Sequence, residues 1–211
     1  MTRVFIADDH VLVREGLKKI LREEIDITVV GEARTAAEVQ ERVGKSKCDI
    51  LVLDLSLPDK SGLDVLKDVK TLYPKTRVLI LSTYPADRFA VRCLKAGADG
   101  YLCKDSAAED LVVALRKVAG GKKYFSEEIT QELADGLTRN DTHAALHATL
   151  SDREFEVFCL LGSGKTITEI ASALNLSIST VNTHRAHILE KMKMESNVQL
   201  IRYAIENKLV D

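Results

Sequence analysis

Hydrophobic and polar residues alternate in blocks along the first 121 residues of the chain. Five short runs, at 4–7, 27–31, 50–53, 78–81 and 100–103, are mostly aliphatic and do not alternate residue by residue. Unbroken apolar runs of this length are typical of strands covered on both faces, as in a parallel sheet. The pattern therefore predicts five buried strands.

Amphipathic segments with helical spacing lie between and after these runs. A capping pair, Ser106 and Glu109, predicts the start of the last of these helices, and Gly120 with Gly121 predicts its end. Five strand–helix repeats with short connections predict a doubly wound, five-stranded parallel α/β sheet of the flavodoxin-like kind over residues 1–121. The apolar stripes expected to face the sheet are Leu12, Leu17, Ile20 and Leu21; Leu63, Leu66 and Val69; Phe89, Cys93 and Leu94; and Leu111, Ala114, Leu115 and Val118.

The pattern becomes purely helical in the last third of the chain. We interpret 122–149 as a linker, in which 126–137 has the pattern of a short helix. Four helices are expected after Leu150, the first beginning at a Ser151–Glu154 capping box and the others covering about 166–174, 179–193 and 197–206. They predict a compact all-α domain over 150–211.

Charge and composition narrow the classes of function. The 211 residues carry 30 Lys and Arg against 32 Asp and Glu, and no segment is strongly basic, so a nucleic-acid role needs a motif to support it. Only four apolar residues precede Asp8, too few for a signal peptide, and no apolar run has the length of a membrane span. The four cysteines lack the paired spacing of zinc or redox sites. These features predict a cytoplasmic protein with no membrane partner.

Polar side chains follow directly after several of the expected strands. Asp8 and Asp9 follow the first strand, Asp54 the third and Ser82 the fourth, while Lys104 ends the fifth. The carboxyl ends of parallel strands meet at one edge of the sheet, where ligands bind. Crowded carboxylates need a cation, and an oxygen-only cluster suits Mg²⁺. A carboxylate in such a site is a candidate nucleophile for a phosphoryl group, whose charge the metal and the lysine would neutralise.

Four segments around this expected site have a specific pattern: 4–10 (VFIADDH), Asp54 followed by 57–62 (LPDKSG), 81–83 (LST) and 100–105 (GYLCKD). Together they resemble the receiver domain of bacterial two-component response regulators. The resemblance implies that Asp54 is the phosphoacceptor and that a sensor histidine kinase is the phosphodonor. It implies a Mg²⁺ site made of Asp8, Asp9, Asp54 and the backbone carbonyl of Ser56. It also implies that the phosphoryl group is sensed by Ser82, Tyr101 and Lys104.

Residues 166–193 have the spacing of a helix-turn-helix. Ala171 is the small residue where two helices would cross, and Asn175 lies in the turn, where Asn tolerates a left-handed backbone. Val181 and Ile188 would anchor the second helix, whose exposed face is uncharged near its start and basic at its flanks. Such a face suits base edges and phosphates. Spacing alone also leaves open a small helical module without a ligand.

The segments 150–154 (LSDRE), 165–171 (KTITEIA), 180–184 (TVNTH) and 188–192 (ILEKM) resemble the LuxR-type helix-turn-helix. Joined to a receiver, the pattern is similar to the NarL/FixJ family of response regulators over nearly the whole chain outside the linker. The resemblance implies that the protein is a transcription regulator and not an enzyme. It also implies that the protein binds double-stranded promoter DNA as a homodimer. The implied DNA-binding residues are Lys165, Thr166, Ser179, Thr180, Asn182, Thr183, Arg185, Ala186 and Lys191. Among them, the resemblance implies that Asn182, Thr183 and Ala186 read bases and that Lys165, Thr166, Arg185 and Lys191 contact phosphates.

These features favour a switch in which phosphorylation of Asp54 biases the region of Ser82 and Tyr101 and thereby controls DNA binding, with the last helix as a candidate dimer contact. A second interpretation keeps DNA binding independent of phosphate and makes the receiver a protein-interaction module. A third is a Mg²⁺-dependent aspartyl-phosphate hydrolase of small phosphoesters, although the sequence has no insertion to form a cap over a substrate.

Overall fold

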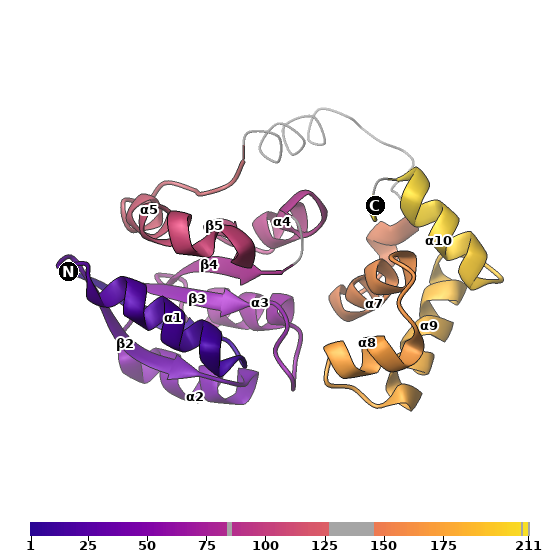
Figure 1. The fold of residues 1–211 in the computed structure, drawn as a ribbon, viewed down its shortest axis with the longest axis horizontal. Coiled ribbons are helices and arrows are strands. Elements are labelled where there is room, and N and C mark those ends of the chain that lie inside the picture. Colours follow the sequence, from indigo (N-terminus) through magenta and orange to yellow (C-terminus); the bar gives the residue numbers. More distant parts are fainter. Residues whose placement is uncertain (84–85, 127–145, 208, 211) are drawn as a thin grey trace. The chain divides into compact units, whose positions relative to one another are not determined.

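The computed structural model describes residues 1–83, 86–126, 146–207 and 209–210. The chain divides into two compact units, Met1–Arg139 and Asn140–Asp211, and each is described by itself (Figure 1). The expected short helix at 126–137 lies outside the described residues from position 127 onward, as does most of the expected linker.

The N-terminal unit is a five-stranded parallel sheet with strand order β2-β1-β3-β4-β5 and helices on both faces (Figure 1). The predicted α/β class is confirmed. The strands are β1 (Thr2–Ala7), β2 (Ile27–Ala33), β3 (Ile50–Asp54), β4 (Arg77–Ser82) and β5 (Gly100–Cys103). The helices are α1 (Val11–Arg22), α2 (Ala36–Ser46), α3 (Gly62–Leu72), α4 (Ala86–Lys95) and α5 (Ala107–Ala119), with a 3-10 turn, η1 (Lys104–Ser106), ahead of α5.

Both faces of the sheet are covered, which explains the unbroken apolar runs. Alternate residues of the central strands, such as Ile6, Val52 and Leu81, pack in one cluster with the buried residues of α1 and α5. The residues between them, such as Phe5 and Leu53, point to the opposite face and are equally buried. A strand buried on both sides has no polar positions to break its pattern.

Two helix positions differ from the sequence-based predictions. Helix α2 was absent from the expected apolar stripes, because its buried side is the narrow stripe of Ala36, Val39 and Val43 in an otherwise polar segment. Leu12, expected to face the sheet, is 87% exposed at the start of α1. The inward face of α1 is formed by Arg14, Leu17 and Leu21.

The end of α5 agrees with its prediction and the start does not. Gly120 is the C-cap, and Gly121 has a left-handed backbone with φ of +77°, which favours glycine. Ser106 precedes α5, but its side chain makes no cap hydrogen bond. Its hydroxyl donates to the Cys103 carbonyl at 3.4 Å, because the chain passes through η1 before the helix begins.

The C-terminal unit is all helical, as predicted. It contains a 3-10 turn, η2 (Leu146–Thr149), and the helices α7 (Asp152–Gly162), α8 (Ile167–Ala173), α9 (Ile178–Lys191) and α10 (Asn197–Glu206). Ser151 and Glu154 form the predicted capping box at the start of α7. Among the described helices, none combines the length and apolarity that a membrane span requires.

Helices α8 and α9 form the predicted helix-turn-helix. Asn175 has φ of +51° in the turn, and the Leu176 amide donates to the Ala171 carbonyl at 2.8 Å. Ala171 is buried at the helix crossing, and Val181 and Ile188 are fully buried on α9. The turn and its anchors therefore fix the first half of α9 with its other face exposed.

Candidate functional site

Two buried carboxylates lie side by side at the carboxyl edge of the sheet. Asp8 directly follows β1, Asp54 ends the adjacent strand β3, and each is 1% exposed. The strand order reverses between β1 and β3, which makes this edge the switch point where doubly wound sheets bind ligands. The fold thus brings two of the predicted acids into one buried place.

Lys104 bridges the two carboxylates. Its Nζ lies 2.7 Å from Asp54 Oδ2 and 2.8 Å from Asp8 Oδ2, and its side chain is only 11% exposed. Burial alone would lower the pKa of Lys104, but the negative charges of Asp54 and Asp8 outweigh it and raise the pKa. The lysine is therefore a fixed positive charge beside Asp54.

One lysine does not balance the negative charge around Asp54. Burial raises the pKa of Asp54, the charge of Lys104 partly offsets this, and the charge of Asp8 adds to the rise. Two buried acid oxygens have a single polar neighbour each in the described part of the chain: Lys104 Nζ beside Asp8 Oδ2, and His10 Nδ1 beside Asp9 Oδ1. Carboxylate oxygens with so few partners and surplus negative charge fit a hard divalent cation such as Mg²⁺. The donor set is thus suited to the implied metal.

Neighbouring residues hold the acid-bearing loops in place. Arg14, 1% exposed on α1, donates from Nη1 to the Asp8 carbonyl at 2.7 Å and from Nε to Glu32 at 3.3 Å. A Cβ on Gly62 would come within 2.4 Å of the Asp54 carbonyl oxygen, so the chain after β3 closes tightly only with glycine here. Sequence reasoning missed Arg14, although its position in the stripe with Leu17 marks a charged residue on an inward face.

The other predicted site residues lie on neighbouring strand ends. The Ser56 amide donates to Asp54 Oδ1 at 3.1 Å, which keeps the loop after β3 against the acid. Ser82 ends β4 next to β3 and is fully buried. Tyr101 is 4% exposed within β5, opposite Ile80 of β4 and three positions before Lys104. Ser82 and Tyr101 thus lie on the adjacent strands β4 and β5, and Ser56 lies in the loop that follows β3.

A segment after α5 also reaches this sheet. The Tyr101 amide donates to the Tyr124 carbonyl at 2.8 Å, and the Tyr124 amide donates to the Asp99 carbonyl at 2.9 Å. Tyr124 therefore extends the sheet beside Gly100 at the free edge of β5. The sequence analysis assigned Tyr124 to the linker and missed this contact.

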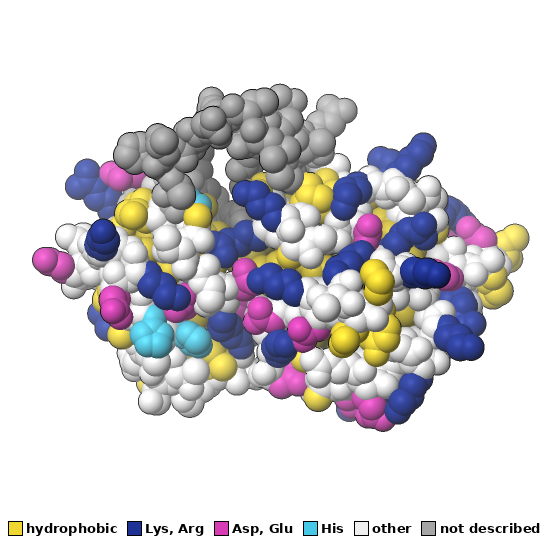
Figure 2. Space-filling model, turned by 180° about the vertical axis from the view of Figure 1, so that it is seen from behind, with side chains coloured by type: hydrophobic (Ala, Val, Ile, Leu, Met, Phe, Trp, Pro, Cys, Tyr) yellow, Lys and Arg dark blue, Asp and Glu magenta, His cyan; other side chains and the backbone are white. Residues whose placement is uncertain are grey.

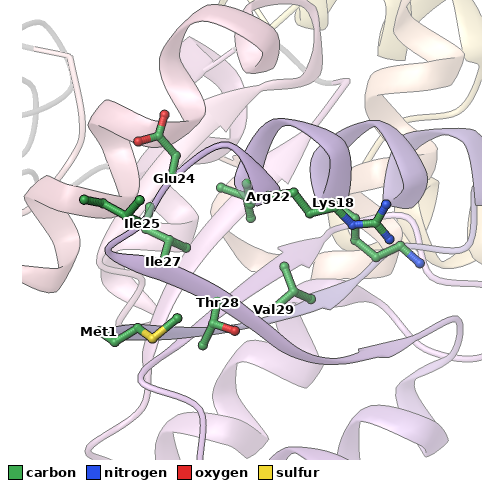
Figure 3. Close-up of a pocket in the computed structure, with 9 residues that line it drawn as sticks. Met1, Lys18, Arg22, Glu24, Ile25, Ile27, Thr28 and Val29 are labelled. Atoms are coloured by element: carbon green, nitrogen blue, oxygen red, sulfur yellow. The ribbon is translucent and has the colours of Figure 1, made fainter.

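A hollow of about 410 Å³ lies at the opposite edge of the sheet (Figure 3). It is lined by Met1, by the first residues of β2, by the end of α1 at Arg22, and by Glu24 and Ile25 between these two elements. These residues belong to the amino ends of the strands, whereas the acids follow the carboxyl ends. The hollow is therefore separate from the acidic site.

The predicted base-reading residues share the exposed side of α9. Asn182, Thr183 and Ala186 are exposed there, as is Ser179 near the start of the helix. The Thr183 hydroxyl donates back to the Ser179 carbonyl at 3.1 Å, and Thr180 is half-buried against the Ser177 cap. The arrangement leaves an uncharged surface at the start of α9.

Three predicted phosphate contacts are held by partners within the unit. Lys191 Nζ lies 2.6 and 2.9 Å from the two Glu154 oxygens, and Arg185 Nε donates to Asn197 Oδ1 at 2.6 Å. Thr166 caps α8 through Glu169, whereas Lys165 is exposed beside it. Lys and Arg side chains are interspersed with acids on the face shown in Figure 2. Any DNA contact would therefore depend on individual side chains at particular positions and not on a large basic patch.

Comparisons with known proteins agree with both halves of this description. Residues 4–116 match the response regulator receiver domain, and residues 148–204 match the luxR family of bacterial regulatory proteins. The oxygen regulatory protein NreC of Staphylococcus aureus is 34% identical over 215 residues, covering 99% of both chains. The chain belongs to the two-component response regulators that join a receiver to a LuxR-type DNA-binding domain, and it is a DNA-binding transcription regulator of that family.

Solved structures give the same assignment for the whole chain. RcsB of Salmonella enterica serovar Typhimurium, bound to promoter DNA in the presence of phosphomimetic BeF3-, is 27% identical with a TM-score of 0.63, covering 96% of this chain and 97% of that one. A structure of two RcsB dimers on two parallel DNAs is 28% identical with a TM-score of 0.59, covering 96% of each chain. The order of the two domains is therefore shared along nearly the full length.

The raised pKa of Asp54 predicts a pH-dependent stability. The folded state holds this proton more tightly than the unfolded chain does. The contribution of Asp54 to stability is therefore full below its ordinary pKa and is lost as the pH rises through the raised pKa. Without divalent cations, Asp54→Asn should gain stability relative to the wild type as the pH rises from about 4 to 7, measured by urea unfolding at each pH.

Asp26→Asn is the matched control, because the pKa of Asp26 is shifted in the opposite direction to that of Asp54. A hydrogen bond from Arg116 lowers the pKa of Asp26, so its contribution is present above its ordinary pKa and is lost as the pH falls through the lowered value. An Asp54→Asn stability curve parallel to that of the wild type would contradict the raised pKa of Asp54.

Proposed function

We propose that Asp54 accepts a phosphoryl group from a phosphohistidine of a partner sensor kinase, in a Mg²⁺-dependent reaction, and that phosphorylation controls promoter binding by a homodimer in the cytoplasm. The observation that carries the proposal is the buried pair of Asp8 and Asp54 bridged by Lys104. An ion pair with surplus negative charge is costly to bury. Its presence in the core therefore indicates a role other than stability.

The transfer is a displacement at phosphorus. A carboxylate oxygen of Asp54 forms the new P–O bond while the P–N bond to the donor imidazole breaks, and the imidazole leaves with the electron pair. Asp8, Asp9, Asp54 and the Ser56 carbonyl would hold Mg²⁺, which would supply charge neutralisation for the phosphoryl oxygens. Lys104, already paired with Asp54, supplies a second positive charge. The chemistry is confined to Asp54 and requires no separate substrate pocket.

The phosphoryl group changes the balance of charge that the site holds. Lys104 would pair with a phosphoryl oxygen instead of bridging Asp8 and Asp54. The hydroxyl of Ser82, at the end of the next strand, would donate to another phosphoryl oxygen, and Tyr101 would follow it to a second rotamer. Such a local event acts by biasing two arrangements of the β4–β5 region.

The start of α9 would read DNA in the major groove. Asn182, Thr183 and Ala186 are exposed on one side and offer an amide, a hydroxyl and a methyl to base edges. Ser179, Thr180, Thr166 and Lys165 lie near the two helix starts, where sugar–phosphate contacts form. Arg185 and Lys191 would contact phosphates by extending from their partners Asn197 and Glu154.

Helix α10 is the proposed dimer contact. Leu200 and Ala204 are fully buried in the core of the unit. The exposed apolar side consists instead of Val198 and Ile205, with the partly buried Ile201 between them. A self-complementary pairing of this side would place two copies of α9 on half-sites of a palindromic operator. The RcsB structure contains dimers bound to DNA, which supports DNA binding as a dimer.

Phosphoryl labelling tests the proposal directly. Asp54→Asn should abolish uptake from acetyl phosphate or a sensor kinase, lowering label to background, because an amide cannot act as the nucleophile. Asp105→Asn is the matched control, since Asp105 is exposed after Lys104 and should keep wild-type labelling. Persistent label on Asp54→Asn would refute the assignment.

Two further readouts separate the alternatives. DNA affinity that beryllofluoride with Mg²⁺ leaves unchanged would favour the receiver as a protein-interaction module. Turnover of a chromogenic phosphate ester would favour a hydrolase.

The two kinds of DNA contact should respond differently to mutation. Asn182→Ala should cost about 1–3 kcal/mol at the cognate base and relax specificity there, because a bidentate base contact is lost. Lys165→Ala should weaken binding to all sequences alike and reduce the salt dependence of log K by about 1. Binding curves on operator and scrambled DNA at several salt concentrations measure both effects. Equal losses on both DNAs for Asn182→Ala would contradict its role in base reading.

The dimer contact should fail when a charge enters the apolar side of α10. Ile205→Glu should lower operator affinity at least about tenfold and leave single half-site binding, because paired binding is lost. Val113→Glu is a control of almost equal exposure, 54% against 53%, on the receiver. Mobility shift and sedimentation of the phosphorylated protein provide the measurements. Full operator affinity of Ile205→Glu would exclude α10 as the contact.

A further inference from the structure

His10 brings a nitrogen donor into the acidic site. Its Nδ1 lies 2.6 Å from Asp9 Oδ1 and 3.4 Å from Asp8 Oδ1. Donor atoms of Asp8, Asp9, His10 and Asp54 all lie within 4.8 Å of one another. Two ligands at right angles around an ion, each about 2.1 Å from it, are about 3.0 Å apart. The distances from His10 Nδ1 to Asp9 and to Asp8, 2.6 and 3.4 Å, lie below and above this ligand–ligand separation.

The imidazole is held near the site by the backbone and is not engaged in helix capping. The His10 amide donates to Asp8 Oδ1 at 2.8 Å, which turns the residue back toward the carboxylates. His10 is the N-cap of α1, but its side chain makes no cap hydrogen bond. The neighbouring oxygen, Asp9 Oδ1, is buried and has no hydrogen-bond partner among the described residues apart from this contact with the imidazole. A cation between the nitrogen and the oxygen would satisfy both.

We propose that His10 is an inner ligand of the divalent ion and gives the site a preference for first-row transition-metal ions such as Mn²⁺ over Mg²⁺. The proposal rests on the cation-dependent function above and adds a nitrogen to its oxygen ligands. Imidazole suits transition metals, whereas Mg²⁺ prefers oxygen ligands and retained water. Three carboxylates and one imidazole form a mixed set that favours the softer ion.

The experiment measures binding of the metal alone to the full chain. Calorimetry should show that His10→Ala lowers Mn²⁺ affinity about tenfold or more and changes Mg²⁺ affinity less than twofold. Electron spin echo spectroscopy of the Mn²⁺-loaded wild type should show modulation from a coordinated nitrogen, which His10→Ala removes. His187→Ala, which deletes another exposed imidazole, should leave both ions and the nitrogen signal unchanged.

The outcomes separate this proposal from the proposed function. Mn²⁺ binding without nitrogen modulation, or equal losses for both ions in His10→Ala, overturns the role of His10 while Mg²⁺ binding and Asp54 labelling still stand. A wild type that takes up neither ion overturns both proposals.

A second inference rests on Tyr124. It occupies the free edge of β5, its ring packs on the core formed with α5, and Lys117 Nζ lies 5.5 Å from the ring centroid. A Cβ on Gly100 would come within 3.0 Å of the Tyr124 Cβ and 3.1 Å of its carbonyl oxygen, so glycine makes room for this contact. The structure assigns to Tyr124 the role of a latch that ties the start of the linker to the strand carrying Tyr101.

The Tyr101 amide donates its hydrogen bond to the Tyr124 carbonyl. A conformational change in β5 would therefore be passed to the chain that continues toward the DNA-binding unit. Tyr124→Pro removes the amide that donates to Asp99 and should reduce the beryllofluoride stimulation of DNA affinity at least fivefold, while Asp54 labelling stays at the wild-type level. Tyr124→Phe keeps ring and amide and should retain full stimulation. Hydrogen exchange of the Tyr101 amide should change with beryllofluoride in the wild type. Unchanged exchange, or full stimulation in Tyr124→Pro, overturns the latch.

Discussion

The acidic site is built on two buried carboxylates, Asp8 and Asp54, which repel each other. The single ammonium group of Lys104 pairs with both and holds them together. This arrangement is a poor source of stability, because burying charge costs more than one lysine restores. It suits the proposed reactivity, because the surplus negative charge favours a bound cation, which together with Lys104 would neutralise a phosphoryl group. The apolar packing of the surrounding sheet, whose strands are buried on both faces, offsets this cost in stability.

The surrounding residues hold this charge cluster and connect it to the rest of the unit. Arg14 and the tight turn at Gly62 hold the loops after β1 and β3, so the acids cannot relax apart. Lys104 is placed by β5, which also carries Tyr101 and accepts the Tyr124 segment on its free edge. A shift of charge at Asp54 would therefore act, under the proposed function, on a strand that is hydrogen-bonded to the start of the linker.

The fold and the acidic site were largely predictable, because continuous apolar runs and acids at strand ends are direct consequences of a parallel sheet. Other features depend on contacts that a linear pattern does not contain. Helix α2 buries only small residues, Ser106 precedes a 3-10 turn, and Tyr124 adds to the sheet from the expected linker. Leu200 and Ala204 of α10 are core residues, and the exposed apolar stripe lies elsewhere on the helix. Periodicity identifies an apolar face but does not tell which of two apolar faces the neighbouring helices cover.

The central claim is that burial, together with the charge of Asp8, raises the pKa of Asp54 by more than the charge of Lys104 lowers it. The most direct measurement is the NMR titration of the Asp54 carboxyl carbon, first without divalent cations and then with saturating Mg²⁺. The account predicts a pKa above the ordinary carboxyl value in the metal-free protein and a clear fall when Mg²⁺ is added. A metal-free pKa at or below the ordinary value that Mg²⁺ leaves unchanged would contradict it.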